Sequence, residues 1–345
     1  MTGLMALALR RSLNGIEHVV PVRPAGASGL VARVYRQVEG EFGLLAPPIA
    51  LHSPVPGVLA ASWLMLRETL LAAGSLDRAS KEAIAAAVSA ANACPYCVEV
   101  HTAALGDAEV DDEWSAWAAR SGDRDRAGAA PGPAAWLPEA LGVVTTFHYL
   151  NRMVTIFLPE SPLPAGLPTA VKGTARRMLT RIMAPEEIRR AGESLDLLPP
   201  AALPADLAWA EPNPAIGAAF ARACAAIDAA ALNVVPAPVR VLVRDELAAW
   251  TGRPPGLGRG WVEDAVAVAP QADRAIARLG LLTALAPFQV DEEVIAQARK
   301  RLAAEDGAAG ADAALIALTA WASLTTARRI GAWAPAAPVP DRPAP

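Results

Sequence analysis

The chain has 345 residues, and its 31 basic and 35 acidic side chains give a net charge of −4. This balance excludes a protein that binds nucleic acid through a strongly basic surface. With 53% hydrophobic and 19% charged residues, the composition predicts a large buried core rather than a disordered chain. At about 150 residues per domain, the length predicts about two globular units.

The sequence predicts neither a membrane span nor a secretory signal. The longest stretch without a charged residue, 42–66, contains four prolines, which a membrane-spanning helix would not carry together. Near the N-terminus, the apolar residues 5–9 precede Arg10 and Arg11, the reverse of the order in a signal peptide. We therefore expect a cytoplasmic protein with no membrane partner.

Apolar residues recur at intervals of three and four, and Ala, Leu, Arg and Glu dominate, so the chain is predicted to be all-α. The expected helices of the first unit are 30–41, 57–73, 78–92, 95–105, 111–120 and 138–157. Pro and Gly clusters separate them.

Proline density divides the remainder of the chain. Residues 159–215 are predicted to be a proline-rich connection, with a basic helix over 172–190. Acidic residues interleave with its arginines, which favours a solvated helix over a phosphate-binding surface. The expected division is an N-terminal extension, a catalytic helical domain, the connection, a second helical unit and a C-terminal tail: 1–29, 30–158, 159–215, 216–335 and 336–345.

The two helical units show a weak internal similarity. Residues 93–98 can be laid over residues 285–290, since both contain a proline followed by an aromatic residue and, two positions later, a valine. This alignment places Ala286 and Gln289 at the positions of Cys94 and Cys97. We expect a duplicated fold whose second copy is degenerate and chemically silent.

Three cysteines are too few for a disulfide framework. Cys94 and Cys97 form a close pair, which in a reducing compartment is typical of redox chemistry or metal binding. Cys224 lies on an apolar helical face, where a free cysteine behaves as a small hydrophobic residue.

The spacing around the pair predicts an activated thiol. Pro95 favours the first turn of a helix, which places Cys94 at the helix end. Cys97 and His101 follow on the same face, three and seven residues after Cys94. The helix N-terminus favours a thiolate, and the imidazole can accept or return a proton. Glu82, on the preceding helix, would reach His101 or Cys97 if the two helices pack antiparallel.

Other interpretations of these residues remain open. Cys94, Cys97, His101 and Glu82 could bind zinc, although tetrahedral structural sites usually take their ligands from two separated pairs. The cysteines could also be a buried structural pair. A c-type haem would require histidine where Val98 stands, and a thioredoxin-like fold would require strands.

The segment from Glu82 to His101 resembles a known family. Its pattern of Glu, eleven residues, Cys, two residues, Cys, three residues and His is similar to the active-site signature of the AhpD-like alkylhydroperoxidases in the carboxymuconolactone decarboxylase superfamily. The resemblance covers about residues 30–158 and implies an all-α fold, usually in a homo-oligomer. It implies that Cys97 is the peroxidatic thiolate, Cys94 the resolving thiol, and Glu82 with His101 the proton relay.

The sequence departs from the family pattern at Tyr96, because the type member has a histidine just before the second cysteine. We expect a shorter or weaker relay, with Tyr96, His148 and His52 as candidate second-layer groups around the cysteines. A satisfied core or surface histidine is the alternative for His148 and His52.

These observations predict a thiol-dependent peroxidase with no bound cofactor or metal. Its partners would be a hydroperoxide substrate and an external dithiol of the lipoyl or thioredoxin-like kind. One alternative is a non-enzymatic redox-sensing protein whose disulfide changes its assembly. Another is the lactone decarboxylase branch of the superfamily, which the presence of both Cys94 and Cys97 disfavours.

Two effects compete over which cysteine is activated. The helix dipole, about 0.3–1 kcal/mol in the first turn, favours Cys94. A positioned base such as His101 contributes about 10²–10⁴-fold to a proton transfer, which favours Cys97. We therefore predict that Cys97 attacks the peroxide and that Cys94 is more exposed and meets the reductant.

Overall fold

The computed structural model describes residues 13–163, except 107, 109 and 111, and residues 189–333. Within these ranges the chain forms helices and no strand, apart from one isolated bridge between Ala72 and Arg189. The predicted all-α fold is confirmed. The basic helix expected over 172–190 falls almost entirely outside the described residues, as do 1–12 of the extension and the tail.

The helices of the first half agree with the predicted ranges to within a residue or two at most ends. In chain order they are α2 Gly29–Phe42, α3 Pro47–Ala50, α4 Pro56–Leu66, α5 Arg78–Ala91, α6 Pro95–Leu105, α7 Asp112–Arg120 and α8 Leu137–Phe157. The exception is the helix expected over 57–73. It changes after Leu66 into a wider π-helical turn, Arg67–Leu71, all of whose side chains are buried.

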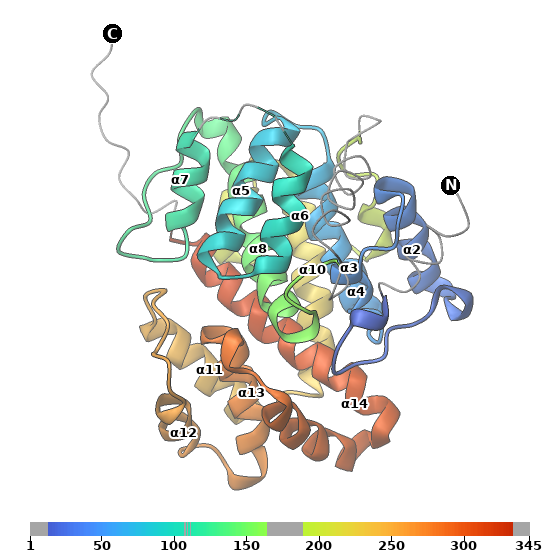
Figure 1. The fold of residues 1–345 in the computed structure, drawn as a ribbon, viewed down its shortest axis with the longest axis vertical. Helices are drawn as coiled ribbons and strands as arrows, with labels where there is room; N and C mark the ends of the chain where they lie inside the picture. Colours follow the sequence, from blue (N-terminus) through green and yellow to red (C-terminus); the bar gives the residue numbers. More distant parts are fainter. Residues whose placement is uncertain (1–12, 107, 109, 111, 164–188, 334–345) are drawn as a thin grey trace.

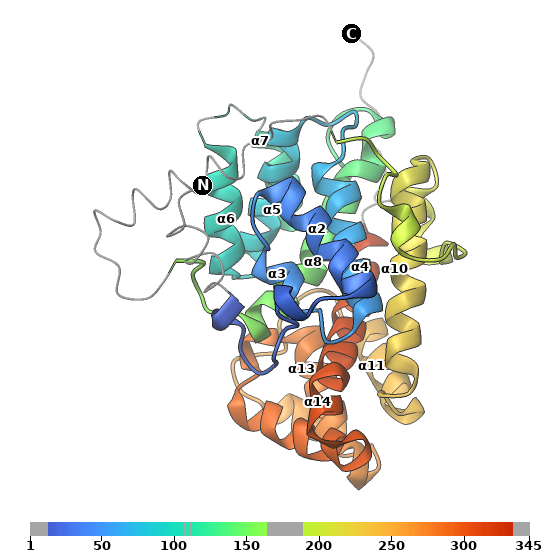
Figure 2. The same cartoon turned by 90° about the vertical axis from the view of Figure 1, so that its right-hand side faces the viewer.

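The helices of the second half pack against those of the first. They are α10 Pro214–Leu232, α11 Ala237–Ala249, α12 Gly260–Val266, α13 Arg274–Leu285 and α14 Glu292–Gly331. The yellow α10 lies along α4, and the long α14 extends from the second-half helices to α8 (Figures 1 and 2). A single apolar core therefore includes residues of both halves.

By length and composition, helix α10 is long and apolar enough to cross a membrane. Half of its apolar 18-residue stretch is buried inside the protein. Its packing along α4 is that of a core helix. Helix α8 is buried along almost its whole length between α5 and α14. The helix beside the cysteine-bearing turn is thus held from both halves.

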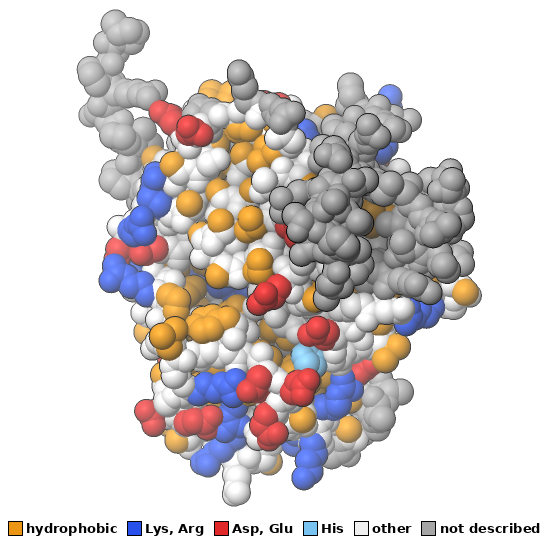
Figure 3. Space-filling model, in the orientation of Figure 1, with side chains coloured by type: hydrophobic (Ala, Val, Ile, Leu, Met, Phe, Trp, Pro, Cys, Tyr) orange, Lys and Arg blue, Asp and Glu red, His pale blue; other side chains and the backbone are white. Residues whose placement is uncertain are grey.

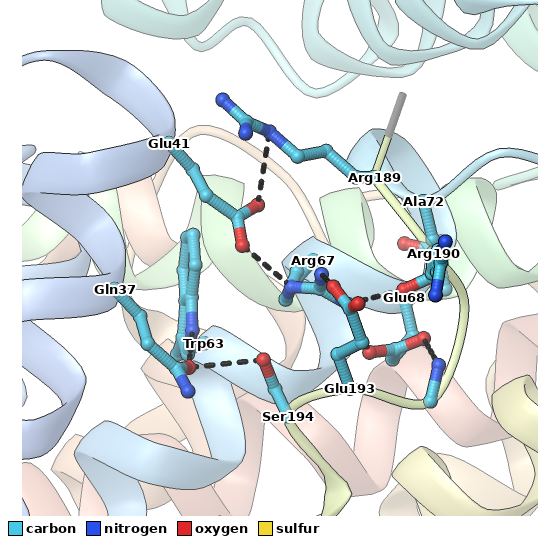
Figure 4. Close-up of polar contacts among 12 residues, drawn as sticks. Gln37, Glu41, Trp63, Arg67, Glu68, Ala72, Arg189, Arg190, Glu193 and Ser194 are labelled. Atoms are coloured by element: carbon cyan, nitrogen blue, oxygen red, sulfur yellow. Dashed lines mark hydrogen bonds and ion pairs between the residues drawn. The ribbon is translucent and has the colours of Figure 1, made fainter. Parts of the chain in front are cut away.

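A buried ionic cluster joins α2, the π-helical turn and the chain after residue 188 (Figure 4). Arg67 is 1% exposed and binds Glu41 through Nε at 2.7 Å, Glu68 through Nη1 at 2.7 Å and Glu193 through Nη2 at 3.0 Å. Ser194 donates a hydrogen bond to Gln37 of α2. The described end of the predicted connection is therefore packed against the first half.

The second half resembles the cysteine-bearing turn only locally. Helix α13 ends before Ala286, which precedes Pro287 as Cys94 precedes Pro95. The chain then forms a short 3-10 helix that stops at Gln289, whereas α6 continues without a break.

Gln289, at the position aligned with Cys97, is tied to a neighbouring loop. Its side-chain amide donates to the Gly256 carbonyl at 2.7 Å, and its Oε1 accepts from Trp261. The prediction of a silent second site concerns this local turn. A duplication of the whole fold stays a prediction.

Candidate active site

The cysteine pair begins at a tight turn between α5 and α6. The Ala93 N–H donates to the Ala90 carbonyl at 3.0 Å, and the Cys94 N–H donates to the Ser89 carbonyl at 2.9 Å. These two bonds form a Schellman motif, in which the residue at Ala93 adopts the left-handed conformation that glycine favours. Ala93 does so with φ of 51°. The backbone placing Cys94 at the end of α6 is therefore held under strain.

Relieving this strain should stabilise the fold. We expect Ala93→Gly to raise the free energy of unfolding by about 1 kcal/mol, because glycine adopts positive φ without a steric cost. Ala90→Gly, within α5, is the matched control and should lower it by about 0.5–1 kcal/mol. Denaturant unfolding measures both. A loss of stability in Ala93→Gly equal to that of the control would contradict the assignment of strain.

Both cysteines are buried in the dithiol form. Cys94 is 1% exposed and Cys97 is 4% exposed. The expectation that Cys94 is the more exposed of the two was wrong. The cause is tertiary packing, because α8 packs against both α5 and α6, the helices that flank the turn at Cys94. An external dithiol must therefore gain access to a sulfur that this packing covers.

The two sulfurs are coupled, and their pKa values are shifted in opposite directions. The pKa of Cys94 is lowered because the Cys97 thiol and backbone N–H, Thr155 and Asn151 all donate to it, which outweighs burial. The pKa of Cys97 is raised well above its usual value by that shared hydrogen bond, by burial and by the neighbouring charge of Cys94. These directions favour negative charge on Cys94 over Cys97. Attack by Cys97 stays a prediction.

Glu82 and His101 meet as the sequence predicted. The Glu82 Oε2 to His101 Nδ1 distance is 2.6 Å, and both side chains are buried. Burial acts to raise the pKa of Glu82, but Arg78 and His101 together hold it below its usual value. Arg78 does this from one turn earlier on α5, with its Nε 2.7 Å from Glu82 Oε1. Glu82 is therefore ionised at neutral pH.

The ionised carboxylate fixes the tautomer of His101. Since Glu82 can only accept, Nδ1 of His101 carries the donated proton, which leaves Nε2 as the acceptor of the neutral ring. The ring stands edge-on to Phe147 of α8, with centroids 4.5 Å apart. His101 is thus oriented by Glu82 on one side and Phe147 on the other.

A second polar chain links the turn to α8 and the end of α7. Ser121 donates to the Ala118 carbonyl, so its hydroxyl oxygen accepts from His148 Nε2 at 3.1 Å. Asn92 Nδ2 then reaches His148 Nδ1 at 3.1 Å and Asn151 Oδ1 at 2.9 Å. Burial lowers the pKa of His148 well below its usual value, so the ring stays neutral. His148 is therefore linked through Asn92 to Asn151, whose Nδ2 donates to Ser89 Oγ at 3.1 Å.

Arg152, the next residue of α8, links this chain to the second half. Its Nη1 donates to the His148 carbonyl at 2.6 Å, and its Nε donates to the Ala284 carbonyl at 3.1 Å. Ala284 lies in the last turn of α13, where carbonyl groups lack helical partners. Burial lowers the pKa of Arg152 to about 9. Arg152 therefore caps α13 as a buried cation.

The other residues considered in the sequence analysis are Tyr96, His52 and Cys224, and only Tyr96 lies beside the cysteine pair. Tyr96 is buried beside the pair, and burial with the neighbouring sulfur charges raises its pKa, so the phenol stays protonated. His52 stacks on Tyr149 and contacts the Ile49 carbonyl, on the α4 side of α8, and burial lowers its pKa to about 3. These contacts do not bring His52 to the cysteines. Cys224 is buried in α10, and burial raises its pKa to about 12.

The sequence analysis missed three side chains around the site: Arg78, Asn92 and Asn151. The spacing of Arg78 four residues before Glu82 was a detectable signal, because such a pair shares a helix face. The partners of Asn92 and Asn151 were not visible in the sequence. Among the residues that the structure describes, no group of three or more His, Cys, Asp or Glu side chains is placed to hold a metal ion.

Comparison with known proteins agrees with this geometry. Residues 58–130, which include Glu82, both cysteines of the pair and His101, match the carboxymuconolactone decarboxylase family. The chain is also 38% identical over 346 residues to an alkyl hydroperoxide reductase of Mycobacterium tuberculosis, an alignment that covers 93% of this chain and 96% of the relative. The protein therefore belongs to the AhpD-like alkylhydroperoxidases of the carboxymuconolactone decarboxylase superfamily.

Proposed function

We propose that this protein is a thiol-dependent peroxidase that reduces organic hydroperoxides through Cys94 and Cys97. The observation that carries the proposal is the 2.6 Å contact between Glu82 and His101 beside a buried pair of thiols. An ionised carboxylate behind an imidazole is the arrangement that lets the ring accept and return a proton. The relative's description as an alkyl hydroperoxide reductase supports the same chemistry.

The first step forms the reactive sulfur. One proton of the dithiol passes to His101, where ionised Glu82 stabilises the imidazolium, and the thiolate forms at Cys94. The Cys97 thiol then gives its proton to the Cys94 thiolate, to which it is hydrogen-bonded. The Cys97 sulfur attacks the distal oxygen of the hydroperoxide, so that an S–O bond forms and the O–O bond breaks.

The next steps close the cycle. The departing alkoxide takes the proton from Cys94 and leaves as an alcohol, with a sulfenic acid on Cys97. The Cys94 thiolate attacks that sulfur and expels hydroxide, which takes the proton from His101 and leaves as water. An external dithiol reduces the resulting disulfide by exchange. We place this cycle in the cytoplasm, where such reductants are present.

The observations favour this function over two alternatives. A redox-sensing protein would also need the cysteine pair. It would not need the Glu82–His101 pair, which serves to transfer protons in a catalytic cycle. A lactone decarboxylase would need neither thiol. The homo-oligomer that the resemblance implies stays a prediction. On the face in Figure 3, apolar side chains spread over the α5–α7 region, and charged side chains gather over the second-half helices.

Hydroperoxide consumption with a dithiol tests the proposal. With cumene hydroperoxide and dihydrolipoamide, the wild type should turn over many equivalents, whereas a sensor would consume one equivalent and stop. A variant with both Cys94→Ser and Cys97→Ser is the negative control, and Cys224→Ser, which alters a buried thiol outside the pair, should turn over like the wild type.

Peptide mapping of the oxidised wild type should find a disulfide between Cys94 and Cys97, with Cys224 free. A single-equivalent reaction in the wild type would overturn the peroxidase, and a disulfide that includes Cys224 would overturn the assignment of Cys94 as the resolving thiol.

A further inference from the structure

The turn that carries Cys94 is bonded to α8 by side chains that the proposed cycle does not use. Helix α5, which precedes the turn, packs against α6, α7 and α8 (Figure 1). Two residues near its C-terminal end, Ser89 and Asn92, make hydrogen bonds to side chains of α8. Ser89 is also the residue whose carbonyl accepts the Cys94 N–H at 2.9 Å. The turn is therefore held both by its own backbone and by α8.

The hydrogen bonds that begin at His148 have one consistent direction. Asn92 Nδ2 can only donate, and it lies 3.1 Å from His148 Nδ1, so Nδ1 is the acceptor and the proton of the neutral ring is on Nε2. Nε2 then donates to Ser121 Oγ at 3.1 Å, and that hydroxyl donates to the Ala118 carbonyl of α7. The ring keeps this form because burial lowers the pKa of His148 well below its usual value.

The same network continues from Asn92 into α5. The other hydrogen of the Asn92 amide reaches Asn151 Oδ1 at 2.9 Å. Asn151 Nδ2 donates to Ser89 Oγ at 3.1 Å, and Ser89 donates to the Ala85 carbonyl at 2.7 Å. Apart from Asn92, which is half-buried, the side chains of the network are buried. Replacing one of them therefore leaves a neighbouring polar group without its partner.

The turn needs this support because its backbone is strained. Ala93 has φ of 51° and lies at the surface between Asn92 and Cys94. Without an outside restraint, we expect the turn to relax toward a negative φ, which would displace Cys94 relative to Cys97. A disulfide tolerates little displacement, since the Cα atoms of its two cysteines must lie about 4.4–6.8 Å apart.

We propose that His148 and Asn92 are positioning residues for the cysteine pair: their hydrogen bond holds the strained turn in the dithiol form and so prepares Cys94 to form a disulfide with Cys97. This inference deepens the proposed function and rests on it for its catalytic meaning. His148 acts through Asn92 and the turn, and not on a reacting atom. Because the turn is held before the reaction, closing the disulfide does not have to impose the strained conformation.

The reduction potential of the cysteine pair tests the proposal. In buffers of reduced and oxidised dithiothreitol, the oxidised reagent takes two electrons and two protons from the protein dithiol, so that one S–S bond forms in the protein and one breaks in the reagent. Acid denaturation stops the exchange and exposes the remaining thiols for alkylation, and mass spectrometry measures the fraction of disulfide. A loss of stability that is equal in the dithiol and disulfide forms does not change this potential.

The variants remove or keep the acceptor of Asn92. His148→Phe keeps a ring and removes the acceptor, so the equilibrium constant for disulfide formation should fall by about three- to tenfold, the factor that one hydrogen bond contributes. The potential then becomes less negative by about 15–30 mV. Asn92→Ala should shift it in the same direction. His148→Gln should stay close to the wild type, because its carbonyl can accept from Asn92 while its amide donates to Ser121.

Tyr149→Phe is the matched control. It removes a buried hydroxyl from the same helix, one that lies 2.9 Å from Ser62 Oγ, and should leave the potential unchanged. Because His148 and Asn92 act through one bond, the double variant should shift the potential no more than Asn92→Ala alone. Circular dichroism checks the fold of each variant. Asn92→Ala, which alters a half-buried side chain, remains the decisive variant if His148→Phe unfolds.

The outcomes separate the two proposals. Potentials of His148→Phe and Asn92→Ala equal to that of Tyr149→Phe would overturn the positioning role, whatever the peroxidase activity. Shifts that add in the double variant would overturn the joint action of the two residues. A wild type that forms no disulfide between Cys94 and Cys97 would overturn both proposals. A shifted potential in both variants, with a wild type that consumes one equivalent of hydroperoxide and stops, would uphold the positioning role and overturn the peroxidase.

Discussion

Cys97→Ser should not react with a hydroperoxide, whereas Cys94→Ser should react with one equivalent and stop at a sulfenic acid. A serine hydroxyl at position 97 is far less acidic and less nucleophilic than a thiol, so it cannot attack the O–O bond. Without Cys94, the sulfenic acid has no neighbouring thiol with which to condense. Trapping with dimedone and mass spectrometry identifies the oxidised sulfur. The first reaction of Cys94→Ser should also be slower, since the proton acceptor of Cys97 is lost.

Variants of the proton relay should lose part of the rate of the reaction with peroxide. His101→Ala and Glu82→Gln should slow the first reaction, His101→Ala by about 10²-fold or more, without abolishing it. Because the pKa of Cys94 is lowered, the alternative is that Cys94 rather than Cys97 attacks the peroxide. If Cys94→Ser is inert to peroxide while Cys97→Ser forms a sulfenic acid, Cys94 is the attacking residue, and the roles of the two cysteines are exchanged.

Arg67→Met should lower the free energy of unfolding by about 3–5 kcal/mol, because it leaves the buried Glu68 without its cation. Burial acts to lower the pKa of Arg67, but Glu41 and Glu68 outweigh it and raise the pKa, so the guanidinium is charged. Methionine is of similar length and apolar, so the expected loss comes from the unpaired carboxylates rather than from a large cavity. Urea unfolding followed by circular dichroism measures the change.

Two further variants show whether burial causes this effect. Arg33→Met breaks an ion pair with Asp196 in which both side chains are well exposed, and should change stability by less than about 1 kcal/mol. Adding Glu68→Gln to Arg67→Met should restore part of the loss, since the amide removes the buried charge. Equal small effects of Arg67→Met and Arg33→Met would mean that the cluster in Figure 4 adds little to stability.

The same buried cluster lies where the structure departs from the predicted helix. In the π-helical turn the side chains of Arg67 and Glu68 are buried and in contact at 2.7 Å, with Glu41 and Glu193 from other elements completing the cluster. The apolar pattern predicted a helix here, but the partners lie 26 and 126 residues away from Arg67, beyond the range of local periodicity.

The sequence by itself determined the positions of the helices and the helix face that carries the cysteine pair and His101. Helix periodicity and proline breaks depend on neighbours within a few residues, so they placed α5, α6 and α8 closely. The spacing of Cys94, Cys97 and His101 on one helix face, and the position of Glu82 one helix earlier, follow from the same local geometry. The contact between Glu82 and His101 needed only that two consecutive helices fold back on each other, which a short turn enforces.

Only the tertiary structure decided how the two sulfurs are distinguished. The sequence showed the dipole of α6 and the imidazole of His101, but not that α8, more than 40 residues after Cys94, would pack against α5 and α6 at the cysteine pair. Burial and hydrogen-bond donors act over a few ångströms in space and not along the sequence. For this reason the local pattern located the site, while the packing of the helices around it determined that Cys94 is buried.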